Sequence, residues 1–265
     1  MMDWGNLLGQ ARLYLLIFAR VAALLRTAPL ISSSAIPPLS RGGLAFFVAL
    51  ALFSSAGRLY GPVPQVGLSY ALALIAEIAL GIIMGLFLQL VFAIFQTAGQ
   101  MFSFQMGFGA SQVYDPLAQV EIPLIGQFLN LVGIGVFLSV SGMLRIFIMG
   151  LTGSFNVMKG TDFLASRSFL QDTFIGSIGG LFEQSLMLAF PMLGTLILIS
   201  VTMGLLAKAA PQMNLLLVGF PLQIGVGFII MLLATPFIAE KMSILIDMGF
   251  ELIETYLLSS REALG

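Results

Sequence analysis

The chain has 265 residues and contains neither cysteine nor histidine. The lack of cysteine excludes disulfides and thiol chemistry, and the lack of histidine excludes His-ligated metal or haem sites and His-based catalytic triads. Charge is also scarce, because 9% of the residues are charged against roughly 25% in a typical soluble domain. The net charge of −1 provides no basic excess to neutralise phosphates, so nucleic acid is not an expected partner.

Hydrophobic residues make up 59% of the chain, and its mean hydropathy is +1.06. These values exclude an ordinary soluble domain and an intrinsically disordered chain. The apolar runs are continuous and do not alternate in units of about ten residues, which favours helices over a membrane β-barrel. We therefore expect an all-α, multi-helix membrane protein. Asp3 and Arg20 do not fit a cleavable signal peptide, so none is expected.

Gaps between charged residues locate the helices, because about 20 apolar residues span a bilayer. Glu77 and Asp115 are separated by 37 uncharged residues, and three later gaps are 23, 24 and 31 residues long. We predict six helical segments, at residues 10–26, 42–58, 68–100, 122–150, 175–207 and 213–238. Residues after Glu240 combine acidic side chains with apolar positions at helical spacing, which predicts a separate amphipathic helix.

No enzyme motif is found. Gly107-Phe108-Gly109 lacks the third glycine of a dinucleotide-binding fingerprint, and neither a phosphate-binding Gly-Lys-Ser/Thr loop nor a nucleophile elbow occurs. The carboxylates are scattered along the chain, and nothing in the sequence pairs them as acid and base. We therefore expect a protein without catalytic activity, cofactor or metal.

A stripe of polar residues lies in the third segment. Gln89, Gln96, Gln100 and Ser103 fall on one helical face, and we include Gln105 among the candidates. Such residues should face protein or water and not lipid. Two interpretations are open: the stripe faces a pore or another subunit, or it forms interhelical hydrogen bonds within the chain.

The same segment carries candidate packing residues. Gly81 and Gly85 have the Gly-x-x-x-Gly spacing that allows another helix to approach closely. Ionisable residues in or beside apolar segments, namely Glu77, Arg145 and Glu183, are costly in a membrane and usually pair or line a hydrated path. Arg145, near a segment end, is expected to extend its charge to the interface instead.

Residues 101–116, with the sequence MFSFQMGFGASQVYDP, form the most unusual stretch of the chain. Methionine packs against varied surfaces, and glycine allows the helix to end in a deformable loop. Two hypotheses remain: the stretch is an interfacial turn, or it is an apolar gate that seals a pore. The gate hypothesis gives a role to Met106, Gly107, Phe108, Gly109, Tyr114, Asp115 and Pro116.

Residues 205–224 resemble the late signature of the FliR family, an export-gate membrane protein of the bacterial flagellar type III secretion apparatus. The matching residues are Lys208, Pro211, Gln212, Asn214, Gly219, Phe220 and Pro221. Glu77, Gly81, Gly85, Gln100, Gln105, Gly107, Asp115 and Pro116 resemble the family's central block. Arg20, Pro29, Pro37 and Arg41 resemble its N-terminal block. Lys208 stands where many family members carry arginine.

The resemblance implies a single-copy subunit of a hetero-oligomeric gate in the bacterial inner membrane, at the flagellar basal body. FliP-type and FliQ-type subunits, together with FlhB- and FlhA-type export components, are the implied partners. Residues 1–170 correspond to a FliP-like inner-ring region, with a plug loop near 101–116, and residues 171–265 to a FliQ-like hairpin. The implied function is passage of unfolded rod, hook and filament subunits. The alternatives are the equivalent subunit of a virulence injectisome and a small-solute secondary transporter.

Overall fold

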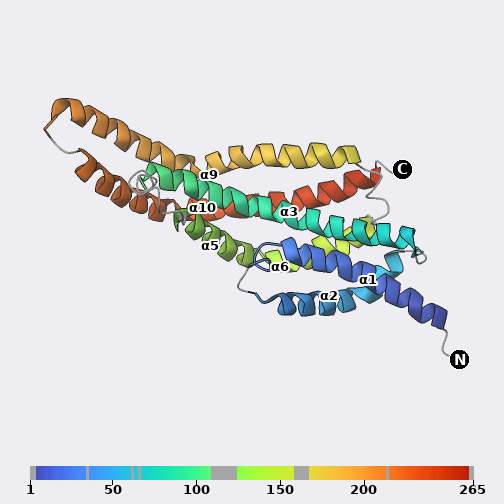
Figure 1. Ribbon diagram of the computed structural model, residues 1–265. Coiled ribbons are helices and arrows are strands. Elements are labelled where there is room, and N and C mark those ends of the chain that lie inside the picture. The colour runs from blue at the N-terminus through green and yellow to red at the C-terminus, as the bar shows by residue number, and fades with distance from the viewer. Residues whose placement is uncertain are drawn as a thin grey trace. The chain divides into compact units, whose positions relative to one another are not determined.

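The computed structural model describes residues 4–33, 36–60, 63–64, 67–108, 124–157, 167–212 and 215–262. Across these ranges the secondary structure is helical without strands, which confirms the all-α prediction (Figure 1). The helices are α1 (Trp4–Thr27), α2 (Pro38–Tyr60), α3 (Leu68–Gln105), α5 (Leu124–Ser139), α6 (Gly142–Arg145), the π-helix η1 (Ile146–Gly153), α7 (Ser154–Val157), α9 (Arg167–Ala209) and α10 (Leu215–Glu262).

Five helical stretches in the described part of the chain are long and apolar enough to cross a membrane. They are Leu7–Thr27, Pro38–Gly57, Leu68–Gln105, Gly179–Ala209 and Leu217–Thr255. A sixth is obtained if α5 and the following α6–η1 stretch are counted as one broken span. The six predicted segments therefore correspond to these five or six stretches, and the differences lie at their ends and breaks.

The predicted 122–150 segment is not one continuous α-helix. Val140 N donates to Val136 O at the end of α5, and Ser141 then adopts a left-handed backbone with φ of 57°. Its carbonyl accepts a hydrogen bond from Arg145 N and so starts a new helical turn. A π-helix follows, in which Thr152 Oγ1 donates to Phe147 O, five residues back. Hydropathy alone does not detect such a break.

Two other predicted boundaries were wrong. The second segment was predicted to begin at residue 42, but α2 begins at Pro38. Proline suits the first turn of a helix because the backbone N–H it lacks has no intrahelical partner there. The acidic tail is helical as predicted, but it is not a separate helix, because α10 continues through Glu240 to Glu262. Buried Ile246, Phe250 and Ile253 extend its packed face.

The chain divides into two compact units. Unit 1 comprises residues 1–91, 141–177 and 246–265, and unit 2 comprises residues 92–140 and 178–245. Helices α3 and α10 contribute residues to both units. The division at residue 170 into FliP-like and FliQ-like regions concerns resemblance to other proteins, and it stays a prediction.

In unit 1, helices α1 and α2 pack through a small-residue face. Ala45, Ala49 and Ala56 of α2 are buried, whereas Leu39 and Phe47 on the same helix are 88% and 67% exposed. Small side chains let two helices approach closely when lipid provides no hydrophobic drive between them. The exposed face of α2 is thus left for lipid or another protein.

In unit 2, the last turns of α3 pack on α5 through glycine. A Cβ on Gly99 would lie 2.5 Å from Cα of Gly126, so the two backbones are in direct contact. Elsewhere in the same contact, the Phe92 and Phe137 rings meet edge to face at 5.6 Å. This packing holds the end of α3 in place beside a second helix.

Candidate functional site

Helix α3 ends inside the predicted gate segment. Gly107 N donates to Phe104 O at 3.0 Å and Phe108 N donates to Ser103 O at 3.2 Å, and Gly107 has a φ of +94°. This pair of bonds around a positive-φ glycine is a Schellman motif, which satisfies carbonyls at the end of a helix. Gly107 therefore terminates α3 and sets the direction in which the chain leaves it.

The end of α3 lies against one face of α10. A Cβ on Gly107 would be 2.5 Å from Cδ1 of Phe220, so the ring lies directly on the glycine backbone. Met106 is fully buried, and its Cε would be 2.7 Å from a Cβ on Gly227. Phe220 and Gly227 are seven residues apart and share a helical face. Apolar packing thus fixes the last turn of α3 on the first turns of α10.

A polar network connects the same two helices with α9. Gln105 Nε2 of α3 and Gln223 Nε2 of α10 both donate to Ser200 Oγ of α9, at 3.1 Å and 2.8 Å. Ser200 Oγ in turn donates to Leu196 O at 3.0 Å. A hydroxyl has one hydrogen to donate and two lone pairs to accept with, so Ser200 uses all of its capacity. The network specifies the register among α3, α9 and α10.

Three of the seven candidate gate residues lie among the described residues, and four lie outside them. Met106, Gly107 and Phe108 lie at the end of α3 as described above. Gly109, Tyr114, Asp115 and Pro116 lie outside the described residues. The structure thus defines the start of the candidate loop and what that start packs against.

Gln89, Gln96 and Gln100 lie along one face of α3, whereas Gln105 lies on another. Gln89 and Gln96 are exposed, and Gln100 is half-buried. The stripe passes Gly126 of α5, where Cγ of both Gln96 and Gln100 would be 3.6 Å from an added Cβ. Gln105 lies on a different face of α3, because five residues separate it from Gln100, and it bonds within the chain.

Residues 205–224, which carry the late family signature, include the connection between two antiparallel helices, α9 and α10. Pro211 lies in the connection between α9 and α10, where Ala210 N donates to Leu206 O. Ser200 of α9 contacts Gln223 of α10, and Cε of Met203 would lie 3.4 Å from a Cβ on Gly219. The later residue of α9 thus meets the earlier residue of α10, as in an antiparallel pair. Lys208 and Gln212 are exposed, Pro221 lies inside α10, and Asn214 lies outside the described residues.

Glu77 belongs to a buried polar cluster in unit 1. Its Oε2 accepts a 2.5 Å hydrogen bond from Arg20 Nε, and its Oε1 accepts a 2.6 Å bond from the Tyr60 hydroxyl. Arg20 also donates from Nη1 to Ser154 Oγ at 3.0 Å, and its guanidinium lies 4.1 Å from the Phe155 ring centroid. The cluster joins α1, α2, α3 and α7 through satisfied charges.

Gly81 and Gly85 of α3 lie against α1. Gly81 is about one helical turn after Glu77, and Gly85 is about two turns after it. A Cβ on Gly81 would clash with the backbone carbonyl of Arg20 and lie 2.8 Å from Ala23 Cβ. A Cβ on Gly85 would clash with the side chain of Thr27. Glycine at these positions is what permits the contact that brings Arg20 to Glu77.

The other ionisable residues in apolar segments behave differently. Arg145 forms an ion pair with Asp247 in unit 1, with both side chains partly exposed, and its guanidinium lies 5.5 Å from the Phe250 ring. Arg145 thus has a specific partner on α10, and its extension to the interface stays a prediction. Glu183 is exposed on α9.

Several residues of these clusters were missed by reasoning from the sequence. They are Tyr60, Ser154, Phe155, Ser200 and Gln223. Each lies on a different helix from its partner, and Ser200 and Gln223 are 95 and 118 positions from Gln105. For the polar members of this set, the available clue was a polar side chain within an apolar helix, because a buried polar group needs a hydrogen-bond partner.

The chain matches the family described as bacterial export proteins, family 1, over residues 11–249. It is 32% identical over 223 residues to the flagellar biosynthetic protein FliR of Bacillus subtilis (strain 168), covering 83% of this chain and 84% of that protein. It is 30% identical over 239 residues to FliR of Escherichia coli (strain K12), covering 90% and 87%. The chain belongs to the FliR family of bacterial export proteins.

A third relative, FliR of Aquifex aeolicus (strain VF5), is 29% identical over 247 residues, covering 92% of this chain and 93% of that protein. The match to FliR proteins extends over nearly all of the chain, as the resemblance in its three sequence blocks predicts. Together with the apolar helices, it shows a membrane protein with a role in flagellar export.

Proposed function

We propose that this FliR-family chain is a non-enzymatic gate subunit of the flagellar type III export apparatus, and that residues from Met106 onward help to close its pore. The observation that carries the proposal is the capped end of α3. There a fully buried Met106 and the positive-φ Gly107 pack on Phe220 and Gly227 of α10. The described end of the candidate gate segment is thus held at a defined position by its packing on α10 and by the polar network with α9 and α10.

The chemistry of this segment suits a seal. A passage wide enough for an unfolded chain leaks ions unless something fills it, and apolar constrictions exclude ions by dewetting. Residues 101–114 contain no charged side chain. Methionine adapts its three rotatable bonds to irregular spaces, so it seals against varied surfaces.

Assembly with other subunits is supported by the exposed apolar faces. In an apolar 18-residue window of α9, 22% of the residues are buried within the chain, and in such a window of α10 the share is 11%. Phe182, Phe190, Leu198 and Leu232 are 60% to 75% exposed. Lipid or other helices must cover these faces. We propose that FliP-type and FliQ-type subunits cover part of them, and that residues 1–170 and 171–265 resemble those two partners.

The remaining parts of the proposal follow from the family. We propose that the chain acts at the flagellar basal body in the bacterial inner membrane, with FlhB- and FlhA-type components and unfolded flagellar subunits as further partners. The relatives described above are all named flagellar biosynthetic proteins, which favours a flagellum over an injectisome. Gln89 and Gln96, exposed on α3, are proposed to face the pore or a neighbouring subunit.

The test is deletion of Gly107–Gln112 in the assembled complex. We expect single-channel conductance to rise above the closed baseline while some protein export continues. A deletion of residues 160–165, outside the proposed gate, is the control and should leave the baseline unchanged. If the first deletion assembles normally and stays closed, residues 107–112 are not the seal, and a methionine-rich loop of a partner becomes the better candidate.

A further inference from the structure

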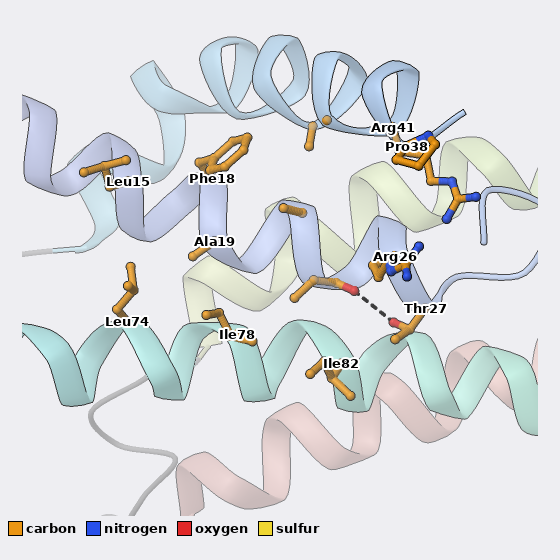
Figure 2. Close-up of a pocket in the computed structure, with 14 residues that line it drawn as sticks. Leu15, Phe18, Ala19, Arg26, Thr27, Pro38, Arg41, Leu74, Ile78 and Ile82 are labelled. Carbon is orange, nitrogen blue, oxygen red and sulfur yellow. Dashed lines mark hydrogen bonds between the residues drawn. The ribbon is translucent and has the colours of Figure 1, made fainter. Parts of the chain in front are cut away.

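An apolar groove with one cationic end lies in unit 1 among α1, α2 and α3. Its volume is about 710 Å³, within the roughly 300–1,000 Å³ range of ligand sites. All but three of its fourteen lining residues lack a polar side-chain group. The exceptions are Arg26, Thr27 and Arg41, which Figure 2 shows together at one end, whereas Leu15 and Leu74 lie at the other.

The groove exists because small residues line α1 and α2 where they face it. Ala19, Ala22 and Ala23 on α1 and Gly42 and Ala45 on α2 leave space between helices that are otherwise in contact. Protein interiors normally fill such space. An apolar hollow is expected to be filled by an apolar occupant and not by water.

The length of the groove matches one lipid leaflet. Leu15 and Arg26 are eleven residues apart on α1, which corresponds to about 17 Å of helix. Half of the hydrocarbon core of a bilayer is about 15 Å thick. Arg26 therefore lies about one acyl-chain length from Leu15 along α1, which is the separation needed for a lipid chain beside Leu15 to have its headgroup beside Arg26.

Arg26 and Arg41 differ in their hydrogen bonding. Arg41 donates from Nε to Ile36 O and from Nη2 to Ser33 O and Ile36 O, at 2.7 to 3.1 Å. These bonds hold its guanidinium at the end of the groove. Arg26 is exposed and forms no hydrogen bond or ion pair with any described residue. Thr27 uses its hydroxyl on Ala23 O and Leu24 O. The apolar groove thus has two cationic side chains at one end: Arg41, which is held by hydrogen bonds, and Arg26, which is not.

We propose that this groove binds an anionic phospholipid, with an acyl chain along Ala19 and Ala22 and the phosphate between Arg26 and Arg41. Arginine suits phosphate because its planar guanidinium donates two parallel hydrogen bonds. Basic pockets between membrane helices are a recognised form of lipid-headgroup site. The inference rests on this groove alone and does not depend on the gate.

The experiment uses the full chain, co-expressed with its neighbouring export subunits and purified in detergent. Native mass spectrometry then follows titration with phosphatidylglycerol or phosphatidylcholine of the same acyl composition. We expect the unaltered chain to prefer phosphatidylglycerol, and Arg26→Gln to weaken that preference about fivefold, the factor associated with one basic residue at an anionic surface. Arg26→Lys should restore most of it. Arg12→Gln, which removes a cation of α1 outside the groove, is the matched control and should have no effect.

A second variant tests the acyl chain. Ala22→Phe fills the groove without changing charge and should reduce the binding of both lipids. If Arg26→Gln and Arg12→Gln retain the same preference as the unaltered chain, the proposal is overturned. It is also overturned if Ala22→Phe leaves lipid binding unchanged but loses co-purifying subunits, because the groove would then hold a partner helix.

Discussion

Arg20 and Glu77 form a fully buried ion pair, 57 positions apart in sequence, in which Arg20 Nε donates to Glu77 Oε2 at 2.5 Å. Both charges have further partners, since Tyr60 donates to the carboxylate and Ser154 accepts from the guanidinium. Satisfied in this way, the pair acts as a point of specific assembly for four helical elements. Removing only one of the two residues is expected to be strongly destabilising, because the other charge is then buried without a partner.

We expect Glu77→Gln or Arg20→Gln to destabilise unit 1 by about 3–5 kcal/mol, the usual cost of removing one member of a buried ion pair. The double variant Arg20→Met/Glu77→Leu should lose less than either single variant, because no unpaired charge remains. Thermal unfolding of the purified chain and the yield of assembled complex measure both effects.

The control for this prediction is the pair of Arg145 and Asp247, whose side chains are 37% and 45% exposed. Asp247→Asn should cost at most about 1 kcal/mol, as exposed pairs do. Equal losses from Glu77→Gln and Asp247→Asn would show that burial does not set the strength of these pairs, and would contradict the prediction.

The same substitution should have opposite effects at two glycines of the α1–α3 pair. Gly9 of α1 has open space around it, whereas a Cβ on Gly81 would clash with the Arg20 carbonyl. Gly9→Ala should stabilise the chain by up to about 1 kcal/mol through helix propensity. Gly81→Ala should destabilise it by about 1–3 kcal/mol through overpacking. Chemical unfolding in detergent distinguishes the two, and a gain in stability at Gly81 would show that α1 does not need this contact.

The fold could be predicted from the sequence to the extent that hydropathy determines it. Charge gaps locate the long helices because a membrane-spanning helix tolerates few charges. They did not reveal the break at Ser141, because serine does not mark a left-handed backbone in a sequence. They also separated the segment ending at residue 238 from the amphipathic helix after Glu240, although α10 is continuous to Glu262, because a change from apolar to amphipathic composition does not interrupt backbone hydrogen bonding.

The candidate site was predictable where a residue type has only a few physical uses. Gly107 and Glu77 stand out because a glycine after an apolar helix ends it and a carboxylate in an apolar helix needs a partner. The partners themselves, such as Ser200 for Gln105, depend on which helices pack together. That pairing is a tertiary property which periodicity within one helix does not contain.

Ser200→Ala should release the end of α3 from the α9–α10 hairpin. The substitution leaves the amides of Gln105 and Gln223 without their shared acceptor, at a cost of about 1–3 kcal/mol. Thr202→Val is the matched control, because its hydroxyl bonds only locally to Leu198 O on an exposed face. We expect Ser200→Ala, and not Thr202→Val, to raise baseline conductance of the assembled complex. Equal baselines with reduced stability in Ser200→Ala would confine the network to a structural role.

Gly107 should be sensitive to substitution for two separable reasons. Its φ of +94° costs an alanine roughly 1–2 kcal/mol in backbone strain. In addition, the new Cβ would press on the Phe220 ring at 2.5 Å. Gly67 provides the control, because it has a φ of +130° but no neighbouring atom within 4 Å of an added Cβ. Gly67→Ala therefore incurs the strain alone.

We expect Gly107→Ala to be more destabilising than Gly67→Ala, and to move the segment after α3 enough to raise the leak conductance of the complex. Adding Phe220→Leu should remove part of the excess, because a smaller side chain yields to the new methyl group. A double-mutant cycle on unfolding free energy measures this coupling between Gly107 and Phe220. Additive losses would mean that the ring and the glycine do not act together, and that the direction in which the chain leaves α3 is set by backbone conformation alone.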